Sequence, residues 1–276
     1  MRTWLRTKAL DVAARVLTKR RRNYRLVLPS EATSLREALQ PGDVVLIDGD
    51  QRISEVIKYL TQSTWSHIAL YVGDEILRRY PAQHDALAAQ HGEDAKHMIV
   101  EALMDGVIAS PVSKYAQFNV RVCRPIGLRH EDRERILDEI LGQLGFRYDV
   151  KNIVDLGRHL FPVSLLPARF QRPALRFGSG GTTEVICSSM IGRAFQNVGF
   201  PILPFVEPAP DLPAPRGWRG WWRNRRSPYP TVFQRQTPTI ITPRDFDLSP
   251  YFEIVKVTPL GPAGRRPFDY RRIRWA

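Results

Sequence analysis

The chain has 276 residues, a formal net charge of +13 and a hydrophobic fraction of 43%. That fraction is enough for a packed core and excludes a wholly disordered protein. Two cysteines are too few for a disulfide scaffold, and the basic charge favours contact with a polyanion, either nucleic acid or an anionic membrane surface.

Residues 1–28 form a basic N-terminal segment. Apolar side chains recur at helical spacing on one face, at Leu5, Ala9, Val12, Ala13, Val16 and Leu17. A basic run, 19–22, follows. Two interpretations stay open: a helix packed on the domain with a solvated basic end, and a helix lying on a membrane. The segment lacks the features of a secretory signal, and no window has the roughly 18 apolar residues of a membrane span. We therefore expect a cytoplasmic protein, dissolved or peripheral on the inner membrane surface.

Residues 29–260 are assigned to one domain. Short apolar or alternating runs bounded by turn residues predict strands at 44–47, 66–72, 98–103, 106–110, 119–125 and 252–257. Helical periodicity predicts helices at 54–60, 131–144 and 149–160, the first capped by Ser54. The polar, alanine-rich segment 82–96 is predicted to be an irregular excursion on the surface.

Composition changes at Glu207. The segment 207–230 is rich in Pro, Arg and Trp and is treated as an insertion, and the tail 261–276 is again basic. Trp favours the membrane–water interface, and each Arg near an anionic surface contributes about 1 kcal/mol. Trp218, Trp221 and Trp222 are therefore candidate membrane contacts. The alternative is a flexible basic linker with incidental tryptophans.

Cys187 is the candidate nucleophile. A glycine-rich loop, 178–181, precedes it, and a helix is predicted from Cys187 until Gly199 ends it. In the first turn of a helix, unpaired backbone N–H groups and the helix dipole favour the thiolate that attacks a carbonyl. An ordinary buried cysteine is the alternative at this position. Cys123 lies within a predicted strand and is interpreted as a core residue.

His67 and Glu101 are the candidate partners of this cysteine. His67 opens a predicted strand whose alternation places it on one face with Ala69 and Tyr71. Glu101 is a carboxylate in an apolar strand, and burying an unpaired charge is unfavourable. His67 would supply a partner, and the carboxylate would hold the imidazole in one tautomer. An arginine is the alternative partner for Glu101.

Five motifs in order carry a family resemblance: PGDVVLIDGD, WSHIALYVGD, VEALMDGV, GFRYD and ICSSMIGRAF. Together with the closing TPRDFDLSPYFEIV they resemble the circularly permuted branch of the NlpC-type papain-like cysteine hydrolases, the YiiX-like proteins, from about Pro41 to Val257. As in that branch, the histidine precedes the cysteine. The resemblance implies an α+β permuted papain-like fold, with a central antiparallel sheet or partial barrel and the nucleophile at a helix N-terminus.

The resemblance also implies roles for single residues. Cys187 would be the nucleophile, His67 the general base and then acid, and Glu101 the residue that orients His67. Tyr148, in GFRYD, matches a tyrosine near the nucleophile and is placed with Ser66 and Ser188 among the contacts to the substrate or the oxyanion. The backbone N–H of Cys187 is a further oxyanion donor.

These roles predict a cysteine hydrolase that cleaves an amide or ester bond through a Cys-His-Glu triad and an acyl-enzyme, without a metal or other cofactor. The spacing of His84, His91 and His97 fits no zinc pattern, so they are interpreted as surface residues. Three substrate classes stay open: a cell-wall-type peptide amide, an acyl amide and a lipid ester. The Trp/Arg-rich segments favour an acylated substrate at the inner leaflet.

Two other functions stay open. One is an acyltransferase on lipid substrates, which differs only in the acceptor that resolves the acyl-enzyme. The other is a catalytically inactive, basic nucleic-acid-binding protein, in which Arg and Trp would contact phosphates and bases. Because the sequence contains no recognised nucleic-acid module, nucleic acid is not the expected partner.

Overall fold

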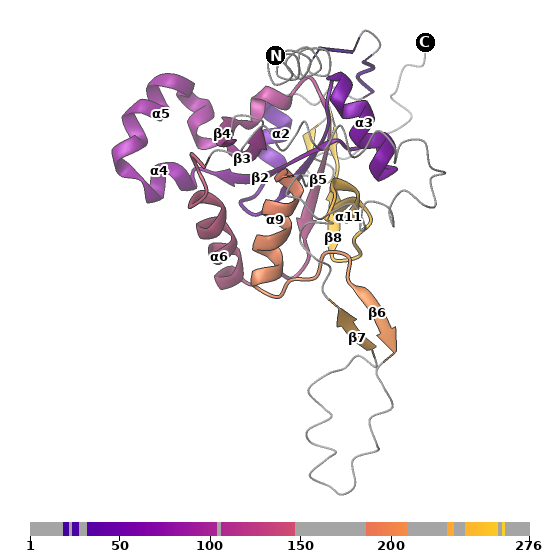
Figure 1. The fold of residues 1–276 in the computed structure, drawn as a ribbon. Helices are drawn as coiled ribbons and strands as arrows, with labels where there is room; N and C mark the ends of the chain where they lie inside the picture. Colours follow the sequence, from indigo (N-terminus) through magenta and orange to yellow (C-terminus); the bar gives the residue numbers. More distant parts are fainter. Residues whose placement is uncertain are drawn as a thin grey trace, which may run out of the picture.

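A six-stranded antiparallel sheet forms the centre of the computed structural model, which describes residues 19–21, 24–27, 32–103, 106–146, 186–208, 231–234, 241–258 and 261–262. The strand order is β4-β3-β2-β1-β5-β8 (Figure 1). The strands are β1 (Val44–Asp48), β2 (His67–Gly73), β3 (Met98–Leu103), β4 (Gly106–Pro111), β5 (Asn119–Pro125) and β8 (Phe252–Val255). All six lie within two residues of the predicted ranges, so these predictions are confirmed.

The central strands β1, β2 and β3 are buried on both faces. Along β1 and β2, alternate side chains enter two separate core clusters, with Ile68 and Leu70 in one and Ala69 and Tyr71 in the other. A strand buried on both faces has no polar side, which is why these segments read as nearly continuous apolar runs in the sequence. The predicted assignment of alternate residues to opposite faces of β2 is therefore confirmed.

Helices α6 (His130–Leu141) and α9 (Ile186–Asn197) lie side by side on the Ile68 face (Figure 1). The buried apolar side chains of α9 belong to the same cluster as Ile68, and they are Met190, Ile191, Ala194 and Phe195. Gly199 follows α9 with a φ of 77°, a left-handed conformation that suits glycine at a helix C-terminus, as predicted. The opposite face is covered by α2 (Ala32–Ala38) and the 3-10 turn η3 (Val112–Tyr115).

Two local predictions were wrong. The helix α3 spans Arg52–Thr61, so Ser54 lies inside it rather than capping it. The N–H of Arg52 instead bonds to the Lys19 carbonyl, which satisfies a first-turn donor from the N-terminal segment.

The segment 82–96 is helical rather than irregular, although it does lie on the surface. It follows α4 (Glu75–Arg79) and consists of the 3-10 turn η1 (Pro81–Gln83), α5 (His84–His91) and the 3-10 turn η2 (Gly92–Lys96). No side chain described for α5 is buried. Leu87 is partly buried against the core, and the high helix propensity of the alanines favours the helix over the other positions.

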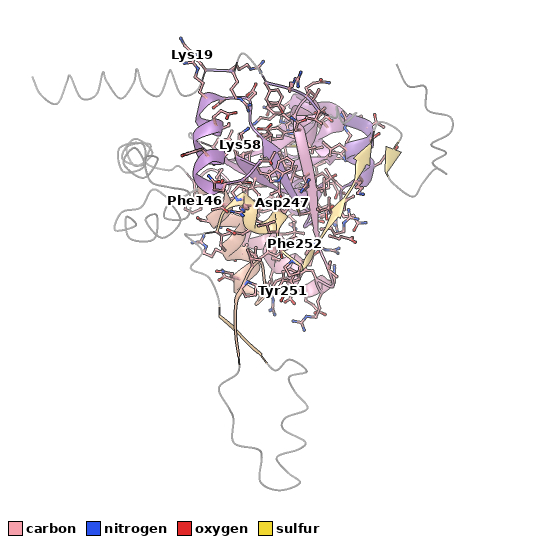
Figure 2. The ribbon with its side chains drawn as sticks, turned by 90° about the vertical axis from the view of Figure 1, so that its right-hand side faces the viewer. Lys19, Lys58, Phe146, Asp247, Tyr251 and Phe252 are labelled. Atoms are coloured by element: carbon pink, nitrogen blue, oxygen red, sulfur yellow. The ribbon has the colours of Figure 1, made fainter. Side chains whose placement is uncertain are left out.

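Near the C-terminus, Thr242 and Asp245 form a capping box that starts α11 (Pro243–Asp247). The strands β6 (Phe205–Pro208) and β7 (Thr231–Gln234) pair as an antiparallel ribbon, with Pro208 opposite Thr231. This ribbon projects from the body in both views (Figure 1, Figure 2), and the predicted insertion lies between its strands. A second small ribbon joins β9 (Val257–Thr258) and β10 (Gly261–Pro262).

Several predictions fall outside the described residues: the helices at 1–17 and 149–160, the glycine-rich loop, the three candidate membrane tryptophans and most of the basic tail. In the part of the chain that is described, no helix combines the length and apolar composition needed to cross a membrane.

Candidate active site

A partly buried histidine–carboxylate pair lies at the start of β2. The Nε2 atom of His67 is 2.8 Å from Oε2 of Glu101. The register pairs Ala69 with Glu101, which brings the carboxylate to the face that His67 shares. The His67 side chain is 17% exposed, whereas that of Glu101 is fully buried. The predicted pairing is confirmed, and no arginine takes part in the contacts described for Glu101.

Two further side chains reach Glu101, and no sequence pattern predicted either contact. The Tyr115 hydroxyl donates to Oε2 at 2.5 Å, and Lys114 Nζ donates to Oε1 at 2.8 Å. Both residues come from η3, which follows β4 and lies on the same face of the sheet. Neither carries a periodic or spacing signal that would connect it with a carboxylate in β3.

These contacts keep Glu101 ionised. Burial would raise the pKa of Glu101, but the hydrogen bond from His67 and the charges of His67 and Lys114 outweigh it and hold the pKa well below its usual range. An ionised carboxylate only accepts hydrogen bonds. His67 Nε2 therefore carries the hydrogen, and Nδ1 is the ring nitrogen that exchanges a proton in a neutral imidazole.

Cys187 is the second residue of α9, and its side chain lies outside the described part of the structure. The helix packs on β2 and β3, the strands that carry His67 and Glu101. Its glycine, Gly192, permits a close approach to the segment before α11, because an added Cβ would lie 2.6 Å from Ile241 Cδ1.

The ends of α9 show its direction on the sheet. Near its start, Ser188 donates to the Ile241 carbonyl at 2.6 Å, and Arg244 of α11 reaches the carbonyl of Thr61, shortly before β2. Near its end, the rings of Phe195 and Phe252 lie 5.3 Å apart, where β8 pairs with the end of β5. The helix therefore starts at the end of the sheet where β2 begins. The buried apolar residues of α9 pack on the face of Ile68, and His67 lies at the start of β2, at the same end of the sheet.

The two predicted site serines, Ser66 and Ser188, are held by hydrogen bonds to the backbone. Ser66 is buried, and its hydroxyl accepts the Gly49 N–H at 2.9 Å. Ser188 is also buried and bonds the Ile241 carbonyl, so both hydroxyls contact backbone groups. Cys123 is fully buried, and burial raises the pKa of its thiol to about 12, which confirms it as a core residue. Tyr148 lies outside the described residues.

The comparison with protein families agrees with this geometry. Residues 38–161 match the model described as "Permuted papain-like amidase enzyme, YaeF/YiiX, C92 family". This region resembles the permuted papain-like amidases. The six-stranded sheet with its helices is the corresponding α+β fold. The match includes His67 and Glu101 and supports a cysteine hydrolase of the amidase type, but it ends before Cys187.

Among solved structures, the chain is similar to one described as the metalloprotein yiiX from Escherichia coli O157:H7, with 16% sequence identity. The alignment covers 79% of this chain and 97% of that chain, with a TM-score of 0.44. A search of the curated proteins gave no match.

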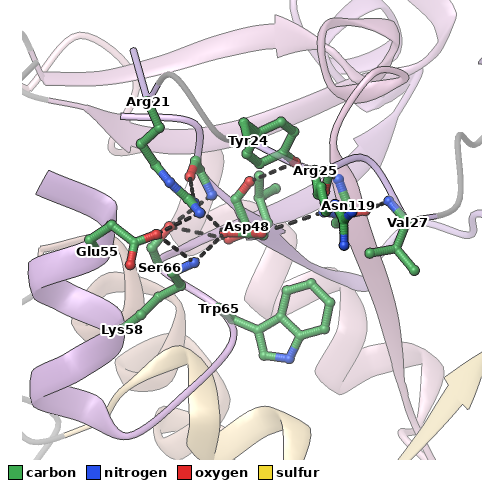
Figure 3. A network of polar contacts seen from close by, with 12 residues as sticks. Arg21, Tyr24, Arg25, Val27, Asp48, Glu55, Lys58, Trp65, Ser66 and Asn119 are labelled. Atoms are coloured by element: carbon green, nitrogen blue, oxygen red, sulfur yellow. Dashed lines mark hydrogen bonds and ion pairs between the residues drawn. The ribbon is translucent and has the colours of Figure 1, made fainter. Parts of the chain in front are cut away.

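Within the amidase-like region, Asp48 ends β1 next to Ile47, the register partner of His67. Its carboxylate is the centre of a polar network (Figure 3). Arg21 and Lys58 contact Oδ1 at 3.3 and 2.9 Å, and both also pair with Glu55. The Tyr24 hydroxyl donates to the Asp48 carbonyl at 3.1 Å. The end of the basic run is therefore bound to the domain, and its interpretation as a solvated end was wrong for Arg21.

Arg21→Gln is expected to lower the free energy of unfolding by about 1.5–3 kcal/mol, because it removes charged hydrogen bonds at a side chain that is only 19% exposed. Arg20→Gln is the matched control. Arg20 pairs with Asp50 but is 84% exposed, so its loss is expected to be below about 1 kcal/mol. Urea unfolding at constant salt measures both values, and equal losses for the two variants would contradict the network.

The remaining histidines form no metal site in the described residues, where no group of three or more His, Cys, Asp or Glu side chains is placed to hold a metal ion. His84 is exposed, as predicted. His91 and His97 are partly exposed, and the Nδ1 of His97 also lies 3.0 Å from the Tyr71 hydroxyl. Burial lowers the pKa of His97.

Proposed function

We propose that the chain is a cysteine amidase in which Cys187 attacks the substrate carbonyl, His67 transfers protons and Glu101 orients His67. The observation that carries this proposal is the partly buried His67–Glu101 pair at the start of β2, on a sheet packed against the helix that begins beside Cys187. The family match supports the amidase chemistry. The role of Cys187 rests on its place in the first turn of α9.

The reaction would proceed in two stages. The Cys187 thiolate attacks the carbonyl carbon, and the Cys187 backbone N–H donates to the oxyanion. His67 donates its Nδ1 proton to the leaving nitrogen, the C–N bond breaks, and an acyl-enzyme forms. His67 Nδ1 then takes a proton from water, whose oxygen attacks the thioester carbon. The C–S bond breaks, the acid is released and Cys187 returns to the thiolate. Glu101 stabilises the imidazolium through Nε2 in both stages, and Tyr148 is proposed to contact the carbonyl.

The substrate proposed is an amide that bears an acyl chain, met at the inner membrane surface. The support is compositional: Trp and Arg are concentrated in 207–230 and in the tail, and both residue types favour an anionic membrane interface. The β6–β7 ribbon supports this arrangement, because it projects from the body and joins the insertion to it (Figure 1).

The test of function is to trap the acyl group on Cys187. The full chain is incubated with an N-acyl amide, a cell-wall-type peptide amide and a lipid ester, quenched in acid and examined by peptide mass spectrometry. An adduct on Cys187 from the acyl amide, absent in Cys187→Ala, is the expected result. Transfer of the acyl group to an added amine, in preference to water, would instead identify an acyltransferase. No adduct on Cys187 from any of the three would overturn the proposal.

Membrane attachment is tested by sedimentation with vesicles. The chain is expected to sediment with vesicles that contain 30% phosphatidylserine and to remain in solution with pure phosphatidylcholine. Since Pro208 pairs with Thr231, residues 209–230 can be replaced by an Asn-Gly turn that closes the ribbon. This variant is expected to lose most of the binding. Unchanged sedimentation would exclude a membrane role for the insertion.

A further inference from the structure

Lys114 contacts the oxygen of Glu101 that His67 does not use. Its Nζ lies 2.8 Å from Oε1, and His67 Nε2 lies 2.8 Å from Oε2. The Lys114 side chain is 38% exposed, although the carboxylate that it contacts is fully buried. One buried negative charge is thus shared between an ammonium group on one side and an imidazole on the other.

The groups around His67 come from several elements. From η3, the Tyr115 hydroxyl shares Oε2 with His67, and the two rings lie 6.3 Å apart. From β1, the register partner is the uncharged Ile47, and the next residue, Asp48, is already paired with Lys58 and Arg21. From α9, the group proposed to act with His67 is the thiol of Cys187. Glu101 is therefore the carboxylate bonded to His67, and Lys114 is the cation bonded to that carboxylate.

We propose that Lys114 is a positioning residue that divides the charge of Glu101 with His67 and thereby sets the pH at which His67 releases its proton. An opposite charge nearby stabilises the imidazolium, and a second cation on the same carboxylate weakens that effect. Lys114 therefore makes His67 easier to deprotonate. Its benefit to catalysis rests on the proposed function, because His67 has to give up a proton in the first stage and accept one in the second.

The test is an NMR titration of the His67 imidazole, which does not depend on activity. It is carried out in a Cys187→Ala background, so that no thiol titrates beside the ring, and the signal is assigned by its loss in His67→Gln. Lys114→Met is expected to move the titration midpoint upward by about one pH unit. Lys114→Arg, which keeps the charge, is expected to restore it. Lys96→Met is the matched control, since Lys96 pairs with the exposed Glu93 on the surface, and it is expected to leave the midpoint unchanged.

An unchanged or lowered midpoint in Lys114→Met would overturn the proposal, as would an equal rise in Lys96→Met. If Lys114→Met does not fold, Lys114→Gln is used, with the same expected direction. The pH profile of amide hydrolysis, measured with Cys187 present, is expected to move in the same direction as the midpoint. A shifted midpoint with an unmoved profile would support the charge sharing and count against His67 as the catalytic base.

Discussion

Replacing Cys187 by alanine is expected to lower the rate of amide hydrolysis by at least about 10³-fold, because no other group in the proposed mechanism forms the acyl-enzyme. Cys123→Ala is the matched control and is expected to keep the activity. Cys123 is fully buried in the core, and the pKa of its thiol is raised to about 12. The rates are measured with the substrate that yields an adduct on Cys187.

Alkylation gives a second readout of the same prediction. At neutral pH iodoacetamide is expected to modify Cys187 and to leave Cys123 unmodified in the folded chain, since the thiolate is the reactive form. His67→Ala is expected to slow the modification of Cys187 at least about tenfold. Equal labelling of both cysteines, with no effect of His67→Ala, would contradict the triad.

Glu101→Gln is expected to lower the hydrolysis rate by about 10³ to 10⁴-fold, although glutamine has nearly the same size. The amide can present its NH₂ group to His67 Nε2, which would move the ring hydrogen to Nδ1 and leave no base for the thiol. Glu253→Gln, at an exposed position on the edge strand β8, is the control and is expected to keep the activity. Equal activity of the two variants would exclude the proposed orienting role.

The effect of Glu101→Gln on the free energy of unfolding is also expected to depend on pH. The pKa of Glu101 is lowered in the folded chain, so below about pH 4 the unfolded chain binds a proton at this residue that the folded chain does not. The stability that ionised Glu101 contributes is therefore fully present above that pH and is lost as the pH falls. Urea unfolding between pH 7 and pH 3 is expected to show the difference between wild type and Glu101→Gln changing only at the acidic end. A difference that is constant across this range would contradict the lowered pKa.

The sequence was most informative where burial was complete. The central strands β1, β2 and β3 were predictable because both of their faces are covered, which demands apolar residues at nearly every position. Glu101 was predictable for the complementary reason, since a carboxylate in such a strand requires a partner. His67 is the first residue of a neighbouring strand and was therefore the predicted partner.

The features that were missed depend on tertiary contacts without a sequence period. Lys114 and Tyr115 contact Glu101 from the 3-10 turn η3, which lies between β4 and β5 in the chain. Arg21 meets Asp48 across a separation of 27 residues. The helix α5 has no buried face among its described side chains, so hydrophobic periodicity could not reveal it. Pairs of charges can form between many positions in so basic a chain, and only the fold selects among them.

The order of the elements has a consequence for synthesis on the ribosome. Five of the six strands of the central sheet, with both His67 and Glu101, precede α9 in the chain. Among the described elements that precede α9, α4 and α6 contribute side chains to the core cluster of Ile68 and Leu70, and α9 then adds Met190, Ile191, Ala194 and Phe195. If Cys187 is the nucleophile, the growing chain assembles its proton-transfer pair first and gains reactivity only when a later helix docks. Because the core lacks these apolar side chains until α9 is made, truncation before residue 186 is expected to yield an inert fragment that is prone to aggregation.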